Sequence, residues 1–490
     1  MPSTVFPRNL ILIVLLALHG ATSSAVSGPA AASVWGDRFV ETLRMDDEAG
    51  QREIISGIYT PGSLQSPGVD RLLAFHQKMR REYAPFDYHH SEVVSTEMGP
   101  GVISHVLHVY LRPKGQAMWR DFQFHLDSSP PHRISRIAFI AEVSEPVSLP
   151  NGDIADASTR AWLDRYIDKL SAETGLSGSL LIAQGATVLH ERHFGFADAA
   201  RARPVDAQTL FNLGSGNKMF TAVVIARLAE QGRLQLTDPL TRHLPELFPD
   251  GLGARVTLAQ LLSHTSGLRE YWTKENEPEM ARARGWRDLL PLVQRAGFGA
   301  APGAQAGYSN SNFIVLGAVI EKVTGRDYFE VVHDLVYRPA GMMHAGSHLV
   351  EGTDLPLATP LARDGESGWK PAPRPKRGSP AGGGYATAAD MLRFARALRE
   401  GRIIRPETLQ QLTRNATQGL PDAFPYGLGF IPEVHGRMSS YGHGGIAPGV
   451  NFEFRHFPGP DLTLIVFSNQ DNGAYDDLRR NVTKLITGQR

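Results

Sequence analysis

Apolar and polar residues alternate along the first third of the chain as they do in half-buried strands. Phe122, Phe124 and Leu126 are separated by polar residues, which predicts a strand with one buried face. Helical patterns predict helices around Trp35–Leu43 and Val69–Glu82, and strand patterns follow at Ser91–Glu97, Val102–Arg112, Met118–Leu126 and Ile134–Val143. We therefore expect an α+β unit over residues 34–147, in which short helices cover an antiparallel sheet.

A turn-rich break at Leu149-Pro150-Asn151-Gly152 ends this unit. Beyond it we expect a larger domain, residues 157–490. Two of its strands are joined tightly at Gly185-Ala186, which predicts a hairpin. The expected strands are Ser177–Gln184, Thr187–His193, Tyr426–Ile431, Asn451–Phe457 and Thr463–Asn469, and the clearest helices are Leu258–Ser263, Phe313–Val323, Met391–Leu398 and Tyr475–Ile486.

One further helical run is apolar on nearly every side as far as Leu228, which places it inside a large protein. Its first turn nevertheless carries Ser215 and Lys218, and a spacing of three puts both side chains on one face. Burial lowers the pKa of an amine, and a neutral amine can take the proton of a serine hydroxyl. The free N–H groups at the helix N-terminus suit a developing oxyanion. A capping serine with a solvated lysine is the structural alternative.

Tyr308 and Asn310 stand two residues apart, just before another apolar helical run. The phenol can shuttle protons if neighbouring cations lower its pKa, and the amide can bind a substrate amide or position Lys218. A capped helix with an interfacial tyrosine explains the same residues without chemistry.

His443, Gly444, Gly445 and Ile446 form a third landmark between expected strands. A cation on a sheet edge can lie against bound substrate there, because glycines do not crowd it. The backbone N–H of Ile446 can join that of Ser215 as an oxyanion pair. A Gly-rich strand end is the structural alternative.

Three other features favour structural interpretations. His264 closes a short helix, where a histidine is more often structural than catalytic. The run Gly382-Gly383-Gly384 predicts a backbone that passes close to another group. His105 and His108 lie three apart on one expected strand and so point to opposite faces, and we expect no metal site.

Composition narrows the function further. Acidic and basic residues balance at 50 each among 490 residues, which gives no electrostatic case for a nucleic-acid partner. Cysteine is absent, which excludes disulfides and thiolate metal sites. We expect no cofactor, and a small molecule or peptide as the substrate.

Residues 1–25 have the pattern of a bacterial signal peptide. Arg8 precedes an apolar run from Leu10 to Leu18, and small residues follow to Ala25. The run is short for a bilayer span of about 20 residues, and an uncleaved anchor is the alternative. We therefore expect a secreted or periplasmic protein with no membrane span after signal removal. Its oligomeric state stays open.

Three motifs resemble, in order and rough spacing, those of the serine β-lactamase and penicillin-binding protein superfamily: Ser215-x-x-Lys218, Tyr308-x-Asn310 and His443-Gly444-Gly445. The resemblance covers about Ala157 to Arg490 and is closest to class C β-lactamases, D-alanyl-D-alanine carboxypeptidases and related esterases. It implies an α+β fold, with an antiparallel sheet flanked by helices beside a helical subdomain and the active site between them. The unit at residues 34–147 lies outside it and looks like a cystatin-like or NTF2-like accessory domain.

The resemblance also implies roles for the motif residues. Ser215 is acylated, Lys218 and Tyr308 share proton transfer, Asn310 positions, His443, Gly444 and Gly445 contact substrate, and the N–H groups of Ser215 and Ile446 hold the oxyanion. Which of Lys218 and Tyr308 is the base stays open.

The third motif departs from that of true β-lactamases, which usually begins with a lysine that binds the substrate carboxylate. His443 is only partly charged near neutral pH, because its ordinary pKa is about 6.5. A histidine there resembles the esterase and D-aminopeptidase branches, so we do not expect strong penicillin hydrolysis. Two functions remain: a secreted serine hydrolase of small esters or amides, and a sensor of the same fold that acylates slowly or not at all. The intact Ser215, Lys218 and Tyr308 favour the first.

Overall fold

The computed structural model describes residues 29–65, 68–99, 102–116, 118–248, 251–347, 354–364, 368–373, 377–420, 423–471 and 473–489. The expected signal peptide, residues 1–25, lies outside the described residues. The chain splits into two compact units, Met1–Leu149 with Asn472–Asn481 and Pro150–Asp471 with Val482–Arg490. The last helix, α14 (Ala474–Thr487), therefore contributes its first part to the N-terminal unit.

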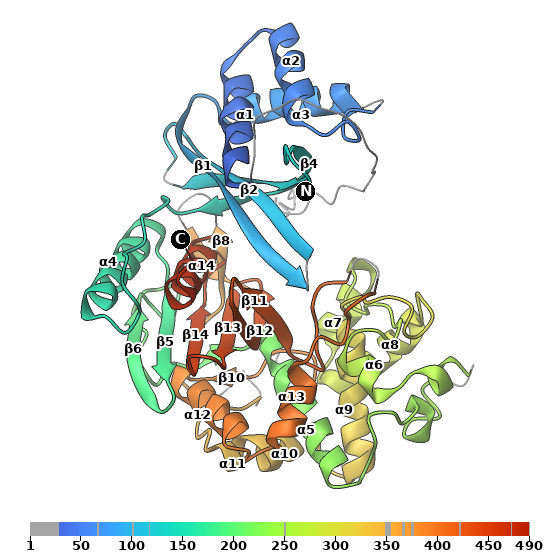
Figure 1. The fold of residues 1–490 in the computed structure, drawn as a ribbon. Coiled ribbons are helices and arrows are strands. Elements are labelled where there is room, and N and C mark those ends of the chain that lie inside the picture. Colours follow the sequence, from blue (N-terminus) through green and yellow to red (C-terminus); the bar gives the residue numbers. More distant parts are fainter. Residues whose placement is uncertain are drawn as a thin grey trace. The chain divides into compact units, whose positions relative to one another are not determined.

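The N-terminal unit is an antiparallel sheet of strand order β1-β2-β3-β4 with helices α1, α2 and α3 on one face (Figure 1). Its core forms around Phe39, whose ring lies 5.5 Å from that of Phe122 and 4.9 Å from that of Phe124. Phe122, Phe124 and Leu126 are buried, as the alternation predicts. The elements are α1 (Val34–Arg44), α2 (Glu48–Ile58), α3 (Gly68–Tyr83), β1 (Phe86–Gly99), β2 (Val102–Pro113), β3 (Trp119–Leu126) and β4 (Ile134–Val143).

Helix α2 has no counterpart among the expected elements. It contains two glycines, which are unfavourable in a helix. A side chain outside the helix sets its start instead. The Asp47 carboxylate accepts hydrogen bonds from the backbone N–H groups of Ala49 and Gly50, which have no partner within the helix.

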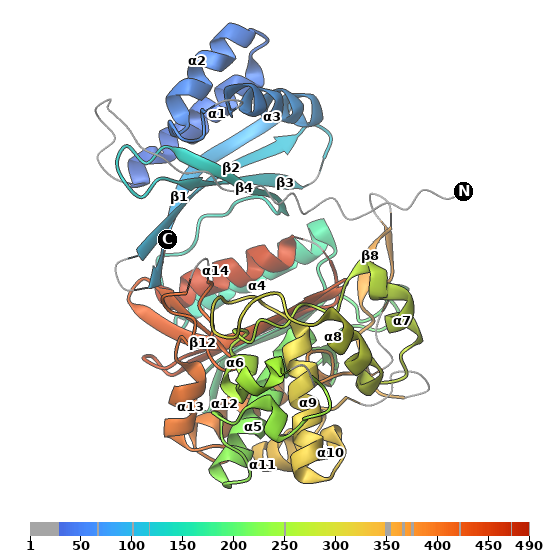
Figure 2. The ribbon, with the colours of Figure 1, turned by 90° about the vertical axis from the view of Figure 1, so that its right-hand side faces the viewer.

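The C-terminal unit contains a six-stranded antiparallel sheet of order β11-β12-β13-β14-β5-β6. Figure 2 shows α4 on one side of this sheet and α5, α12 and α13 on the other, with α6 to α10 gathered beside it. The predicted hairpin at Gly185-Ala186 joins β5 to β6. The sheet strands are β5 (Gly178–Gln184), β6 (Thr187–Phe194), β11 (Ile431–His435), β12 (Met438–Ala447), β13 (Val450–Phe457) and β14 (Leu462–Ser468).

The other elements are short strand pairs and helices. The pairs are β7 (Phe211–Asn212) with β10 (Tyr385–Ala386) and β8 (Leu361–Asp364) with β9 (Gly368–Pro371), and the helices are α4 (Ala157–Thr174), α5 (Lys218–Glu230), α6 (Leu258–Leu262), α7 (Glu277–Arg282), α8 (Leu290–Ala296), α9 (Asn310–Thr324), α10 (Tyr328–Val332), α11 (Arg338–Ala340), α12 (Ala388–Arg399) and α13 (Pro406–Thr413).

The expected strand at Tyr426–Ile431 is wrong. Strand β11 begins only at Ile431, because the backbone before it turns back on itself. The N–H of Gly427 donates to the carbonyl of Phe430 at 2.8 Å, and Gly429 has a φ of +84°, which favours glycine. This turn carries Tyr426 towards the site described below.

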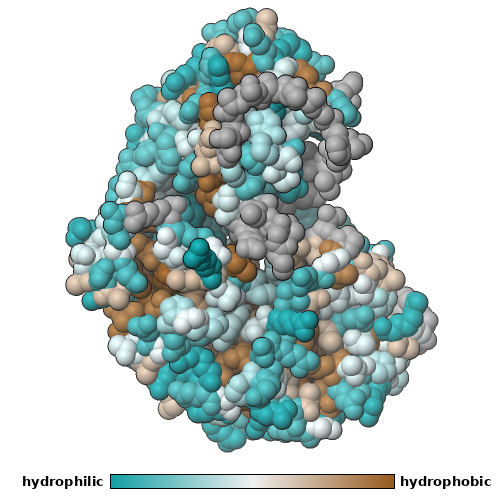
Figure 3. Space-filling view, in the orientation of Figure 1, coloured by the Kyte–Doolittle hydropathy of each residue, from teal (hydrophilic) through white to brown (hydrophobic). Residues whose placement is uncertain are grey.

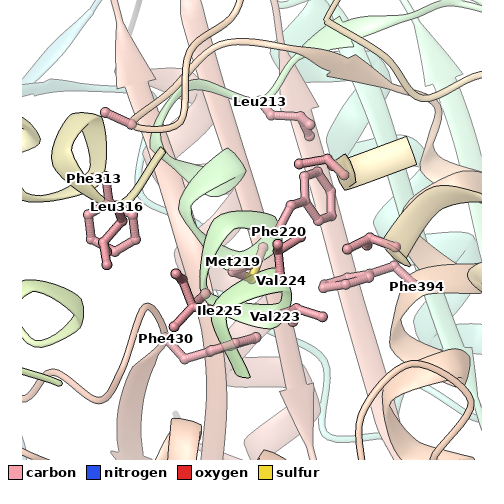
Figure 4. Close-up of a cluster of buried hydrophobic side chains, with 14 of the residues drawn as sticks. Leu213, Met219, Phe220, Val223, Val224, Ile225, Phe313, Leu316, Phe394 and Phe430 are labelled. Carbon is pink, nitrogen blue, oxygen red and sulfur yellow. The ribbon is translucent and has the colours of Figure 1, made fainter. Parts of the chain in front are cut away.

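Helix α5 lies at the centre of the main core. Phe220, Val223 and Val224 are wholly buried, and side chains of α9 and α12 surround them (Figure 4). The expectation of an apolar helix inside a large domain is therefore confirmed. At the surface, hydrophilic side chains alternate with hydrophobic patches (Figure 3). In the described part of the chain, no helix is both long and apolar enough to cross a membrane.

Candidate active site

Ser215 lies on a short 3₁₀ turn, η2 (Gly214–Asn217), which joins β7 to α5. The expectation of a serine within the first α-helical turn is thus shifted by one turn, since α5 begins at Lys218. Gly214 has a φ of +49°, a conformation that bulkier residues rarely adopt. Side chains three residues apart in a 3₁₀ turn lie directly above one another, so Lys218 stacks over Ser215.

Lys218 is fully buried, and three acceptors surround its amine. Nζ lies 3.0 Å from Oγ of Ser215 and 2.7 Å from Oδ1 of Asn310, and it also donates to the carbonyl of Ala381. Desolvation lowers the pKa of the Lys218 ammonium to about 7, although the carboxylate of Glu270 opposes this shift. The amine is therefore partly neutral near neutral pH.

Tyr308 and Asn310 flank the amine at the start of α9. The Tyr308 side chain is hydrogen-bonded to the side chain of Ser215, and Nζ of Lys218 lies 4.9 Å from the centre of the Tyr308 ring. Desolvation raises the pKa of Tyr308 above its ordinary value of 10, so a pKa lowered by neighbouring cations, the condition set out for a proton shuttle, is not met. The buried ring of His264 packs against the ring of Tyr308, and 4.3 Å separates the two ring centroids. This place fits the predicted structural role of His264.

Glu270 holds the Asn310 amide. Its Oε2 accepts from the backbone N–H of Asn310 at 2.8 Å and from Nδ2 at 2.9 Å. Because a carboxylate only accepts, the amide must present its NH₂ to Glu270 and its oxygen to Lys218. Sequence reasoning assigned no role to Glu270, which belongs to none of the three motifs.

His443 lies on β12 and is buried, with both ring nitrogens hydrogen-bonded. Nδ1 donates to the carbonyl of Gly444 at 2.5 Å, so Nε2 accepts from the Tyr426 hydroxyl at 2.9 Å. Desolvation, helped by the positive charge of Lys218, lowers the pKa of His443 to about 3. The expectation of a partly charged histidine is therefore corrected: at neutral pH the ring is neutral. Tyr426 as its partner was not foreseen.

The glycines of the third motif let β12 approach the serine turn. The pairing of β11 with β12 ends at Gly442, so among the described strands none pairs with the following residues of β12 on that side. A methyl group added to Gly445 would lie 2.0 Å from the carbonyl oxygen of Leu213, and one added to Gly214 would lie 3.2 Å from the nitrogen of Ile446. This contact brings the N–H of Ile446 beside the backbone that carries Ser215. Gly444 is less crowded.

The glycine run at 382–384 closes the site behind Lys218. The N–H of Gly383 donates to the carbonyl of Gly214 at 2.9 Å, and the N–H of Leu213 donates to the carbonyl of Gly384 at 3.2 Å. The predicted close passage of this backbone is thus against the serine turn itself. The same loop supplies the Ala381 carbonyl that accepts a hydrogen bond from Lys218. None of the three sequence motifs predicts this contact.

The structure therefore brings together residues from all three motifs. Ser215, Lys218, Tyr308 and Asn310 are in direct contact, while Gly445 and Ile446 reach the serine turn through the backbone. His443 joins them through Tyr426, whose ring lies 6.3 Å from that of Tyr308. Within the described residues, no group of His, Asp or Glu side chains is arranged to hold a metal ion.

Comparison with known proteins agrees with this arrangement. The family model described as Beta-lactamase matches residues 163–488. Esterase EstB of Burkholderia gladioli is 32% identical over 54% of this chain and 76% of its own length. D-aminopeptidase of Cereibacter sphaeroides is 27% identical over 64% of this chain and 60% of its own length. A penicillin-binding protein from Bacillus halodurans superposes with a TM-score of 0.60 and 30% identity, covering 65% of this chain and 98% of that one.

A serine hydroxyl, a buried amine and a phenol in contact on this fold define a serine hydrolase. The chain belongs to the beta-lactamase family. The expected α+β fold of the C-terminal domain is confirmed, whereas the cystatin-like or NTF2-like assignment of the first unit stays a prediction.

Proposed function

We propose that this protein hydrolyses a small ester or amide through an acyl-enzyme on Ser215. The observation that carries the proposal is the contact between Ser215 and Lys218. Nζ lies 3.0 Å from Oγ, and burial lowers the pKa of that amine to about 7. An amine with this pKa can accept the hydroxyl proton near neutral pH, which makes the oxygen nucleophilic.

The other contacts of Lys218 support it as the base. A neutral amine has two N–H donors and one lone pair. The carbonyl oxygens of Asn310 and Ala381 only accept, so they take the two N–H groups. The lone pair is then directed at Ser215. Tyr308 does not compete for this role, because its raised pKa keeps the phenol protonated.

The reaction follows from these placements. Oγ of Ser215 attacks the carbonyl carbon while its proton moves to Nζ of Lys218, and the N–H groups of Ser215 and Ile446 hold the oxyanion. The bond to the leaving group breaks as the Tyr308 hydroxyl gives its proton to that group and takes the proton held by Lys218, so that the phenol stays protonated. A water molecule then attacks the acyl carbonyl, and the acid leaves with the serine hydroxyl restored.

Neutral substrates suit the site better than penicillins. The third motif supplies a neutral histidine whose acceptor nitrogen is occupied by Tyr426, so it offers no positive charge to a substrate carboxylate. Exposed apolar groups stand near the serine instead: Phe424 is 37% exposed with its ring 6.4 Å from that of Tyr308, and Ile446 is 75% exposed. Simple esters are therefore the first substrate class to test, and neutral D-amino-acid amides or peptides are the second.

Two features outside the hydrolase domain complete the proposal. Residues 1–25 direct export to the periplasm or the medium, a role supported by the charged start and short apolar run of the sequence. Residues 34–147 form an accessory domain of cystatin-like or NTF2-like type, which is supported by helices packed on one face of a four-stranded antiparallel sheet.

The test is a burst experiment with a p-nitrophenyl ester on the mature protein and on Ser215→Ala. A burst of one equivalent followed by steady turnover, both lost in the variant, is the expected result. Intact-mass spectrometry then locates the acyl group, with a β-lactam as a second acyl donor. A stable adduct on Ser215 without turnover would favour the alternative, a sensor that acylates slowly. No Ser215-dependent acylation by either donor would refute the mechanism.

A further inference from the structure

Glu270 is a half-buried carboxylate at the site whose contacts go to the machinery around Lys218. Oε2 accepts two N–H groups of Asn310, from the backbone and from the side chain. Oε1 accepts the backbone N–H of Trp272 at 2.9 Å. Three donors therefore fix the carboxylate, and it in turn fixes the Asn310 amide.

The backbone that carries Glu270 is tied to the start of α9. The hydroxyls of Ser309 and Ser311 donate to the carbonyl of Arg269 at 3.1 and 2.6 Å, and the N–H of Tyr271 donates to Oγ of Ser311 at 3.1 Å. Glu270 and Asn310 are thus held by the same set of backbone contacts. Their mutual geometry does not depend on a bound substrate.

The orientation of the amide decides what the lysine lone pair can do. With its oxygen towards Nζ, Asn310 occupies one N–H of the neutral amine and leaves the lone pair for Ser215. With the amide turned over, its NH₂ would donate to that lone pair, and Lys218 could no longer accept the serine proton. Turning it over would also set two acceptors, the amide oxygen of Asn310 and Oε2 of Glu270, against each other.

We propose that Glu270 is a positioning residue, which holds the Asn310 amide in the single orientation that directs the Lys218 lone pair at Ser215. This inference rests on the proposed function, because it concerns the base of that reaction. The carboxylate also acts on Lys218 through charge. It favours the protonated amine and so opposes the effect of burial on the Lys218 pKa.

Replacements of Glu270 separate these two effects. Glu270→Gln removes the charge and replaces one acceptor by a donor, whereas Glu270→Asp keeps the charge but shortens the reach. For Glu270→Gln we expect kcat to fall about tenfold or more, as for a lost hydrogen bond to a charged group, with little change in KM. The acid limb of its pH–rate profile should move to lower pH. Glu270→Asp should lose kcat while its acid limb stays in place.

A double-mutant cycle tests whether Glu270 acts through Asn310. In an Asn310→Ala background, Glu270→Gln should cause little further loss of kcat, because the amide to be positioned is gone. Glu277→Gln, an exposed glutamate nearby in sequence, is the matched control for charge, and its kinetics should equal those of the wild type. All variants are assayed with the same p-nitrophenyl ester, and their folding is compared by circular dichroism.

The outcomes distinguish this inference from the proposed function. A Glu270→Gln variant with unchanged kcat, with an unmoved acid limb or with an effect on KM alone would overturn the positioning role. So would full multiplication of the losses in the double variant. In each case a Ser215-dependent burst in the wild type would leave the hydrolase itself standing. If the wild type shows no burst, the proposed function fails, and the role of Glu270 fails with it.

Discussion

Gly445 is the point where a single methyl group should separate the two N–H groups of the oxyanion site. The Cβ of an alanine there would lie 2.0 Å from the carbonyl oxygen of Leu213 and 2.9 Å from its carbon. An ordinary carbon–oxygen contact is about 3.3 Å, so β12 and the serine turn must move apart by roughly 1.3 Å. Both atoms belong to the backbone, and no side-chain rotation can relieve the contact.

A displacement of that size takes the N–H of Ile446 out of hydrogen-bond range of the oxyanion. Removal of one oxyanion donor lowers kcat by about 10²–10³-fold, and we expect this loss for Gly445→Ala. The assay is steady-state hydrolysis of a p-nitrophenyl ester, with the burst amplitude reporting the fraction of intact sites. Gly444→Ala should lose less, since its nearest contacts would be at 3.3 and 3.4 Å, and Gly459→Ala, with open space, should match the wild type. A Gly445→Ala enzyme within about threefold of wild-type kcat would refute this reasoning.

Two further predictions concern pH and stability. The rate should fall as pH drops through about 7, because Lys218 must be unprotonated to accept the serine proton. It should not fall at mildly alkaline pH, because the pKa of Tyr308 is raised. A wild-type pH–rate profile that stays flat through neutral pH would contradict this assignment. Phe220→Ala should lower the free energy of unfolding by about 3–5 kcal/mol, because Phe220 is fully buried and its ring lies 4.9 Å from that of Phe394. Denaturant titration measures this loss. The same titration should find no such loss for Val188→Ala, whose side chain is 44% exposed.

Sequence patterns alone singled out Ser215 and the side chains that the structure places in contact with it. Ser215 and Lys218 are recognisable because a spacing of three on a helical turn is a local property, and an apolar helix implies burial of the amine. Tyr308 and Asn310 follow from their position before a helix. The alternation around Phe122 likewise predicted a strand of the N-terminal unit. Such features depend on residues close together in sequence, where the backbone geometry is known in advance.

The protonation states depend on contacts that are distant in sequence. His443 was expected to be partly charged, but burial, helped by the positive charge of Lys218, lowers its pKa and keeps the ring neutral. The sequence left open whether neighbouring cations lower the pKa of Tyr308, and in the folded chain desolvation raises it. A motif identifies a side chain, whereas the pKa of that side chain depends on the groups that the fold packs around it.

The contacts around Lys218 likewise come from distant parts of the chain. The carbonyl of Ala381 and the carboxylate of Glu270 reach the Lys218–Asn310 pair from loops far along the chain, and neither belongs to a motif. The same holds for the first part of α14, which groups with the N-terminal unit, where Asp477 accepts from the Ser144 hydroxyl at 2.8 Å. Local sequence determines which residues are chemically able to react, because it fixes the side-chain types and their spacing along a helix. The orientation and charge of those residues come only from the folded chain, because burial and hydrogen-bond partners are set by segments that meet in space.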